Sequence, residues 1–422
     1  MMERTTAPSA RSLRALDYLN LFLADVRDGI GPYLAIYLLA THHWDAASIG
    51  LAMSAMGIAT FLAQTPAGAL IDKVRQKRLL IVLAAVVVSI GCIVMTIFPT
   101  LYGIVAAQAA LGLAVAIFPP AIAALSLGLV GYKQLSARIG RNEAFNHAGN
   151  VGAAVLAGLI GHFIAREGIF YLVAAVAVAS IISVLFIKEE DIDHRLARGA
   201  TSDEDPTGEH VSGVTALISD PRILIFALAV TLFHFANAAM LPLAGQLLSE
   251  GKATGASLYM SACIIVAQLV MIPTAIVAGT YADRWGRKPI FLLGFAVLPL
   301  RGLLYTLSDD PFFIVAVQVL DGIGAGIFGV LWVLVVADLT KGTGRYNVTQ
   351  GAIATAHGIG ASLSNLVAGY IVQMAGYSAA FLTLAGVAVM ALVLFAVAMP
   401  ETRPARGHAS VVTPVAAKAP IS

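Results

Sequence analysis

The sequence contains twelve apolar stretches, each long enough to cross a lipid bilayer as a helix. A helix needs about 20 mostly apolar residues to span a hydrocarbon core about 30 Å thick. Only 12% of the residues are charged, about half the share that is usual in soluble domains. The sequence therefore predicts an all-α membrane protein with twelve transmembrane helices. Breaks at proline, glycine and clustered charges place them at residues 15–40, 48–70, 79–98, 101–130, 138–164, 168–187, 222–248, 256–280, 289–307, 311–337, 347–374 and 378–399.

The distribution of lysine and arginine predicts on which side of the membrane each loop lies. With the N-terminus placed in the cytoplasm, 22 of the 26 Lys and Arg residues fall on the cytoplasmic side, 2 fall outside and 2 lie within helices. Such an excess of positive charge is typical of cytoplasmic loops. We therefore expect a multi-pass protein of the cell inner membrane with both termini in the cytoplasm.

One charged segment interrupts the apolar pattern near the middle of the chain. Residues 188–210 contain Gly and Pro and have no apolar periodicity, which is typical of a linker. The end of the chain is rich in Ala, Pro and Val and predicts a disordered tail. The predicted organisation is a cytoplasmic N-terminal tail (1–14), an N-terminal six-helix bundle (15–187), a cytoplasmic linker (188–221), a C-terminal six-helix bundle (222–400) and a disordered cytoplasmic tail (401–422).

The two predicted bundles resemble each other at a nearly constant spacing. The segment GALIDKVRQKR at 68–78 aligns with GTYADRWGRKP at 279–289, an offset of 211 residues. Two homologous halves in the same orientation are typical of transporters, whose site lies between the halves near the bilayer midplane. Three further pairs, in separate helices, lie 210 residues apart: Pro32 with Pro242, Gln108 with Gln318, and His147 with His357.

Over nearly its whole length, the chain resembles the major facilitator superfamily. The most specific match is the sequence from Gly279 to Lys288, which resembles that family's motif between the eighth and ninth helices. The first-half copy differs from it, because Arg75 and Gln76 replace the expected Gly-Arg pair. Glycine lets two helices approach closely, and Asp can face a helix N-terminus. The resemblance implies two pseudo-symmetric bundles that rock about a central site, with a cytoplasmic gate formed by Gly68, Asp72, Gly279, Asp283, Arg284 and Arg287.

Two features depart from that resemblance. The family's fourth helix often carries an Arg at the position that Gln108 occupies here, and Gln318 takes the matching place in the second half. The predicted fifth helix also lacks the Gly-Pro pair of many drug–proton exchangers. Both departures argue against a drug antiporter, and neither affects the predicted fold.

Three charged residues lie inside the first predicted helix. Asp28 lies about 13 residues from its cytoplasmic end, and at 1.5 Å per residue this depth is about 20 Å, close to the membrane centre. Asp25 lies on the same helix face, and Arg27 can reach back toward it. An ionised Asp at this depth costs about 2.5–3.5 kcal/mol. The three residues therefore form either a structural Asp–Arg pair or a cavity-lining proton or substrate site.

Other predicted helices carry polar residues at helical spacing. His234 and Asn237 lie three apart in the seventh, and a stripe from Asn142 to Asn150 follows one face of the fifth. Such a stripe serves either transport or hydrogen bonding between helices. Arg301 is expected to be structural and to snorkel to the nearby membrane surface. The candidate substrate- and proton-binding residues are Asp25, Arg27, Asp28, Gln108, Asn146, His147, Asn150, His234, Asn237, Gln318, Asp321 and His357.

These residues predict a secondary active transporter for a small organic solute. Buried Asp and His groups can exchange protons, and the sequence contains no phosphate-binding loop or ATPase domain. We expect proton coupling, export slightly favoured over import, a monomer, and no cofactor or resident metal. The net charge of +2 gives no reason to expect nucleic acid, and no catalytic motif predicts an enzyme. The alternatives are a carrier of a transition metal or its chelate, using His and Asp ligands, and a non-transporting receptor or assembly factor.

Overall fold

The computed structural model describes residues 8–28, 30–194, 196–198, 220–251, 255–340 and 346–403, and over these residues it is helical and has no strand. Two short 3₁₀ helices, η1 (Glu189–Asp191) and η2 (Leu196–Arg198), follow the first half. The long helices are α1 (Ala10–Asp28), α2 (Ile30–His42), α3 (Ala46–Lys73), α4 (Lys77–Ile97), α5 (Leu101–Val115), α6 (Phe118–Phe163), α7 (Gly168–Leu185), α9 (Pro221–Ala238), α10 (Met240–Gly251), α11 (Ala256–Trp285), α12 (Arg287–Leu304), α13 (Pro311–Leu339) and α14 (Tyr346–Ala398).

These helices cross the molecule twelve times, as the sequence predicts. Helices α6 and α14 each contain a glycine with a positive φ, Gly131 at 67° and Gly376 at 84°, where one pass ends and the next begins. Glycine adopts this backbone region without the steric penalty that a Cβ imposes. Three passes consist of two helices each: α1 with α2, α5 with the first part of α6, and α9 with α10.

The passes differ in how well they suit a lipid environment. By length and composition alone, eight stretches of the described residues qualify as membrane spans. The α1–α2 pass, the second part of α6 and α12 do not qualify, and all three carry charged residues inside the helix. These charges need partners inside the protein.

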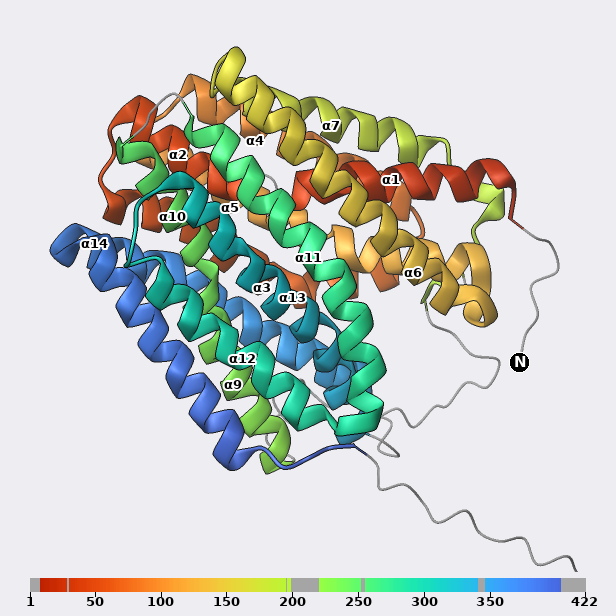
Figure 1. The fold of residues 1–422 in the computed structure, drawn as a ribbon. Helices are drawn as coiled ribbons and strands as arrows, with labels where there is room; N and C mark the ends of the chain where they lie inside the picture. The colour runs from red at the N-terminus through yellow and green to blue at the C-terminus, as the bar shows by residue number, and fades with distance from the viewer. Residues whose placement is uncertain are drawn as a thin grey trace, which may run out of the picture.

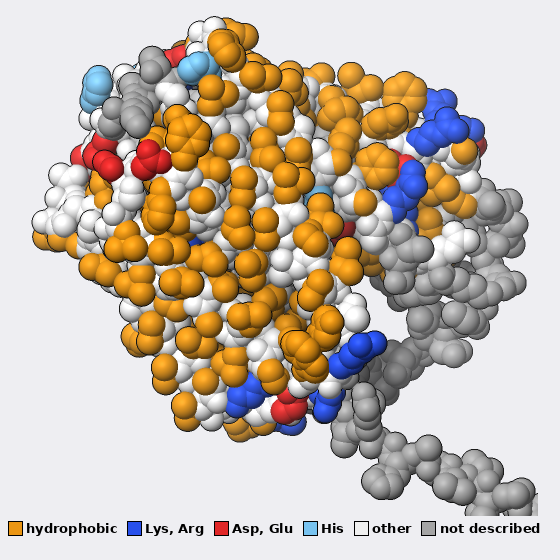
Figure 2. All heavy atoms as spheres, in the orientation of Figure 1, with side chains coloured by type: hydrophobic (Ala, Val, Ile, Leu, Met, Phe, Trp, Pro, Cys, Tyr) orange, Lys and Arg blue, Asp and Glu red, His pale blue; other side chains and the backbone are white. Residues whose placement is uncertain are grey.

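Each half of the chain builds an apolar core of its own. One buried cluster draws its residues from Ala15 to Ala197, and the other draws nearly all of its residues from Ile223 to Met399. Apolar side chains also cover much of the visible outer surface (Figure 2). An exterior of this kind fits a protein that is surrounded by lipid.

Small residues bring the two halves into contact. A Cβ on Gly50 of α3 would collide with the backbone carbonyl of Asn365 on α14, and a Cβ on Gly158 of α6 would collide with the Ser261 hydroxyl on α11. A hydrogen bond of 2.7 Å joins the hydroxyls of Tyr33 and Ser261. Close helix approach at small residues is the usual way that helices associate in membranes.

The contacts between the halves are concentrated toward one face of the molecule. We call this the loop face; it includes the α2–α3 connection at 43–45 and the Gly376 bend. The opposite termini face includes the start of α1, residues 188–198 and the segment 401–403. Figure 1 shows α1 and α9 running apart toward their N-terminal ends, whereas α2 and α10 lie side by side. The halves are therefore closed at the loop face and apart at the termini face.

Parts of the predicted linker and tail pack against the bundles. Ile192, Leu196 and Ala197 are buried, and the Asp193 amide donates to the Gly128 carbonyl of α6 at 3.0 Å. At the chain end, the Glu401 carboxylate accepts from the Arg287 amide at 2.8 Å. Residues 199–219 and 404–422 lie outside the described part, so the predicted domain limits stay predictions.

Replacing Gly50 with Ala is expected to lower the free energy of unfolding, measured by denaturant titration in detergent, by about 1–3 kcal/mol, because the added methyl group overpacks the α3–α14 contact. The matched variant Gly386→Ala adds the same methyl where nothing lies within 4 Å. It is expected to be neutral or stabilising by about 0.5–1 kcal/mol. Equal effects of the two variants would show that the close approach at Gly50 is not important for stability.

Candidate functional site

A cavity of about 540 Å³ lies between the two halves, and α1, α2, α3, α5, α6, α9 and α14 line it. Its apolar walls include Met53, Met56 and Phe61, and its polar groups are amides, hydroxyls and one imidazole. Among the described residues that line it, none is Asp, Glu, Lys or Arg. The polar side chains at this central cavity are Thr60, Gln64, Gln108, His357, Ser362 and Asn365.

A second cavity of about 220 Å³ lies inside the second half, between α9, α12 and α13. It is lined by His234 and Asn237 of α9, Arg301 of α12 and Asp321 of α13. The structure thus brings three of the predicted residues together from two passes, and it adds Arg301. In contrast to the central cavity, this inner cavity contains full charges.

Arg301 and Asp321 form an ion pair at the inner cavity. The guanidinium also donates to Asn237 Oδ1 at 2.9 Å, and the Arg301 side chain is only 2% exposed, against 21% for Asp321. The prediction that Arg301 snorkels to the membrane surface was therefore wrong. The Asp321 carboxylate and the Asn237 amide supply the partners that the surface was expected to supply, and a buried charge such as that of Arg301 needs such partners.

Two histidine rings connect the cavities. His234 lines the inner cavity and His357 lines the central one, and their ring centroids lie 3.8 Å apart. Trp332 contacts both rings, with centroids 6.5 Å from His234 and 5.8 Å from His357. This arrangement places two imidazole rings between a charged cavity and one whose described lining is uncharged.

The other predicted residues lie in different surroundings. Asp25 is 5% exposed and lies outside the linings of both cavities, and the side chains of Arg27 and Asp28 are outside the described part of the structure. Gln108 lines the central cavity with 1% exposure, and its Oε1 has no hydrogen-bond partner. Gln318, at the matching repeat position, instead donates from Nε2 to the Tyr305 hydroxyl.

The polar stripe of the fifth pass connects helices rather than lining a cavity. His147 Nδ1 is hydrogen-bonded at 2.9 Å to Gln268 of α11, across the boundary between the halves. Asn146 Nδ2 donates to Glu143 Oε2 at 3.3 Å on its own helix, and Asn150 is half-buried. Within the second half, the Ser364 hydroxyl of α14 accepts a hydrogen bond of 3.0 Å from the Ala239 amide, which lies between the end of α9 and the start of α10.

The predicted gate motif lies at the termini face. Nothing lies within 4 Å of a Cβ built on Gly68, and one on Gly279 would lie 3.7 Å from Val330 of its own half. Arg284 is exposed, and Arg287 pairs with Asp338 of α13 at 3.1 Å. The side chains of Asp72 and Asp283 are outside the described part of the structure.

Glu401 binds the start of α12 next to this motif. Burial alone would raise the pKa of its carboxyl, yet the pKa lies below its usual value because the backbone N–H groups of Arg403, Arg287 and Lys288 donate to it. A carboxylate at a helix N-terminus is stabilised in this way. The segment after the last pass is thereby fixed to the motif of the second half.

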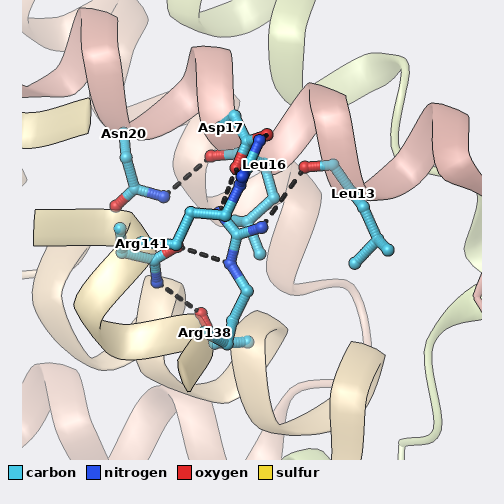
Figure 3. Close-up of polar contacts among 8 residues, drawn as sticks. Leu13, Leu16, Asp17, Asn20, Arg138 and Arg141 are labelled. Atoms are coloured by element: carbon cyan, nitrogen blue, oxygen red, sulfur yellow. Dashed lines mark hydrogen bonds and ion pairs between the residues drawn. The ribbon is translucent and has the colours of Figure 1, made fainter. Parts of the chain in front are cut away.

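A further charged network, which the sequence analysis missed, lies near the termini face of the first half. Figure 3 shows Asp17 of α1 facing Arg138 and Arg141 of α6, at 2.6 and 2.8 Å. Arg138 also donates to Asn142 Oδ1 at 2.7 Å, and Asn142 donates to the Ser126 hydroxyl at 2.9 Å. The signal was present in the sequence, because an Asp inside the first pass and two Arg residues at the start of the fifth pass each require a partner.

Metal binding finds little support among the described residues. They contain no group of three or more His, Cys, Asp or Glu residues placed to hold a metal ion together. The His234–His357 pair supplies only two imidazoles, and the acidic residue at the inner cavity is paired with Arg301.

Comparisons with known proteins agree with this architecture. The family model for the Major Facilitator Superfamily matches residues 18–275 and 254–418. An uncharacterized MFS-type transporter of Mycobacterium tuberculosis (strain H37Rv) is 52% identical over 402 residues, which cover 95% of this chain and 96% of that protein. The multidrug resistance protein MdtL of Escherichia coli (strain IAI1) is 29% identical over 198 residues, which cover 45% of this chain and 48% of MdtL. The nucleoside transporter NupG superposes with a TM-score of 0.74 at 17% identity, over 91% of this chain and 98% of NupG, and so shares the fold.

Replacing Arg138 with Ala is expected to lower the free energy of unfolding by about 1–3 kcal/mol, because it removes the buried one of the two arginines that pair with Asp17 and leaves the buried Asn142 Oδ1 without its donor. Arg141→Ala removes the same charge from a side chain that is 58% exposed, so its effect should be much smaller. Denaturant titration of both variants in detergent tests the comparison. Equal losses would mean that burial does not determine the strength of this network.

Proposed function

Because the chain belongs to the Major Facilitator Superfamily, we propose that it carries a small organic solute across the membrane by alternating access, driven by protons. It is a multi-pass membrane protein of a transporter family and not an enzyme. The observation that carries the proposal is the contact between His234 and His357, which joins a central cavity whose described lining is uncharged to an inner cavity that contains the Arg301–Asp321 ion pair. Solute binds in the central cavity, and protonation changes the charge of the inner cavity.

The ion pair supplies a physical route for coupling. Protonation of Asp321 removes its attraction to Arg301, which then keeps only Asn237 as its partner. An unpaired charge in a protein interior is strongly unfavourable. The inner cavity therefore has two arrangements, one for each protonation state, and His234 transmits the difference to His357. A ligand or proton shifts such an equilibrium only through unequal affinity for the two states.

The proposed cycle starts from the arrangement in this structure. With both termini placed in the cytoplasm, the halves are closed on the outer side and apart on the cytoplasmic side. Rocking of the halves would then close the termini face, where the Gly68 and Gly279 motifs lie. Gly68 has open space beside it in the present arrangement. We propose that the gate closes when the helices that carry the two motifs move together and fill this space.

The lining of the central cavity favours an uncharged, amphipathic solute. Its walls combine methionine and aromatic side chains with amides and hydroxyls, and none of its described lining residues offers a full charge to neutralise an ion. Pockets of this kind bind an apolar body and orient it through a few polar groups. A sugar phosphate or another polyanion would find no cationic partner among these described residues.

We propose export as the direction of transport. The partial similarity to MdtL, which is named for multidrug resistance, supports export, whereas the departures in the fourth and fifth passes argue against simple equivalence to a drug antiporter. The two alternatives remain a metal or metal-chelate carrier and a non-transporting receptor. Neither one accounts for an uncharged cavity that lies next to a buried ion pair.

Proton coupling predicts that Asp321→Asn lowers solute accumulation driven by a pH gradient in inverted vesicles about 5- to 150-fold, the range of typical coupling free energies. Solute exchange without a gradient should be retained. A panel of neutral and charged solutes identifies the substrate first, and Asp28→Asn is measured in parallel for the first pass.

The control is Asp309→Asn, which makes the same change at an exposed residue and is expected to transport normally. Accumulation that persists after the proton gradient is collapsed would refute coupling, even if Asp28→Asn or Asp321→Asn were inactive. A receptor would instead be supported by two results together: the wild type transports none of the solutes, and every variant that neutralises a buried charge keeps the protein's function in the cell.

The central cavity predicts a second effect, on solute affinity. Gln108→Leu should raise the KM for transport about 2- to 10-fold, the value of one hydrogen bond, because Gln108 lines the proposed solute site and its buried Oε1 has no hydrogen-bond partner among the described residues. Gln318→Leu changes the repeat-related residue, which binds Tyr305 outside both cavities. It is expected to alter stability and leave KM unchanged. Equal KM values for both variants and the wild type would exclude Gln108 from solute binding.

A further inference from the structure

A groove of about 460 Å³ lies on the outside of the first half, between α1 and α7, away from both cavities. Arg11 and Arg14 form its end at the termini face, and Tyr18 and Phe22 continue along the same side of α1. These α1 positions follow helical spacing, so their side chains share one face. From α7 the groove receives Ala179, Ile182, Ser183 and Phe186.

The groove is basic at one end and apolar along its walls. None of the nine residues that line it is acidic. The Arg11 guanidinium lies 4.8 Å from the centre of the Phe186 ring, so an aromatic face supports it. Two acidic residues lie near its basic end, and both have partners. Asp17, three residues after Arg14 on α1, pairs with Arg138 and Arg141. Asp191 accepts from the Ser12 hydroxyl at 2.6 Å and also from Ser9.

The position of the groove in the membrane matches this division. Ile182, Leu185 and Phe186 of α7 are each about half exposed, as side chains that face lipid should be. The two arginines lie on the basic termini face, where a polar headgroup would lie. Figure 2 shows basic side chains at the end of the molecule where α1 begins, next to apolar surface.

We propose that this groove binds one anionic phospholipid, with its phosphate on Arg11 and Arg14 and an acyl chain along Tyr18, Phe22 and Ile182. Guanidinium groups bind phosphate oxygens through charge-assisted hydrogen bonds. Basic pockets at the cytoplasmic ends of membrane helices recognise anionic headgroups in this way. The lipid would connect α1, whose pass contains the Asp25–Asp28 cluster, to α7 of the same half. The site is independent of the transported solute.

The test is native mass spectrometry of the full-length protein, released from nanodiscs that contain phosphatidylcholine and phosphatidylglycerol. The wild type should retain one phosphatidylglycerol in preference to phosphatidylcholine. The double variant Arg11→Gln/Arg14→Gln should bind it about thirtyfold more weakly, from two basic groups near an anionic surface. Ala179→Phe fills the groove without changing charge and should also reduce retention.

The matched control is Lys73→Gln/Arg75→Gln, which removes two exposed basic residues from the same face outside the groove. It should retain lipid as the wild type does. An equal loss in this control would reduce the effect to general attraction between a basic face and anionic lipid, and would overturn the proposal. Equal retention of both lipids, undiminished retention in the Arg11/Arg14 variant, or displacement by inorganic phosphate alone would overturn it as well. Circular dichroism of each variant confirms that a loss does not come from unfolding.

Discussion

The structure depends on one constraint, which is that a charge inside a lipid-embedded helix has to find its partner within the protein. Arg301 meets it through Asp321 and Asn237, and Asp17 meets it through Arg138 and Arg141. Asp17, Arg138, Arg141 and Arg301 lie in passes that do not qualify as membrane spans by composition, whereas Asp321 and Asn237 lie in passes that do. The ion pairs therefore determine which helices pack against each other, and the Arg301–Asp321 pair is the group on which the proposed proton coupling acts.

The fold could be predicted from the sequence because its signals are local and repeated. Twelve apolar runs define twelve passes, and Pro32 in the first turn of α2 and Pro242 in the first turn of α10 mark two of the three that divide into two helices. The sites were harder to predict, because the pairing of polar side chains depends on which helix faces meet in the folded protein. Spacing along the chain identified Asp321, His234 and Asn237 as buried polar residues, but only the packing of α9, α12 and α13 brings them to Arg301. For the same reason, Gln108 and Gln318 share a repeat position and yet have different surroundings.

The two halves repeat their packing but not their charges. Gly112 lies against the Met56 carbonyl of α3, and Gly322 lies against the Ala267 carbonyl of α11, at the matching places in the repeat. The ion pairs do not follow this symmetry, because the Asp17 network lies near the termini face of the first half and the Arg301 pair lies deep in the second. Small residues thus preserve the same close helix approaches in both halves, whereas the positions of the charged residues differ between the halves. An asymmetric distribution of this kind suits a carrier in which both halves bind solute and one half binds the proton.

Helix α14 is where these two roles meet. His357 touches His234 at the inner cavity, the adjacent Gly358 packs against Phe61 of α3, and one turn further Ser362 packs against Gly57. In the proposed cycle, rocking of the halves would displace α3 against α14 and would move the segment that carries His357. Packed helices shift between discrete arrangements rather than deforming continuously, so a change in the Arg301–Asp321 pair that repositions His234 would also shift the contacts between the halves. Motion between the halves would in turn alter the proposed proton site, as the reciprocity of linked equilibria requires.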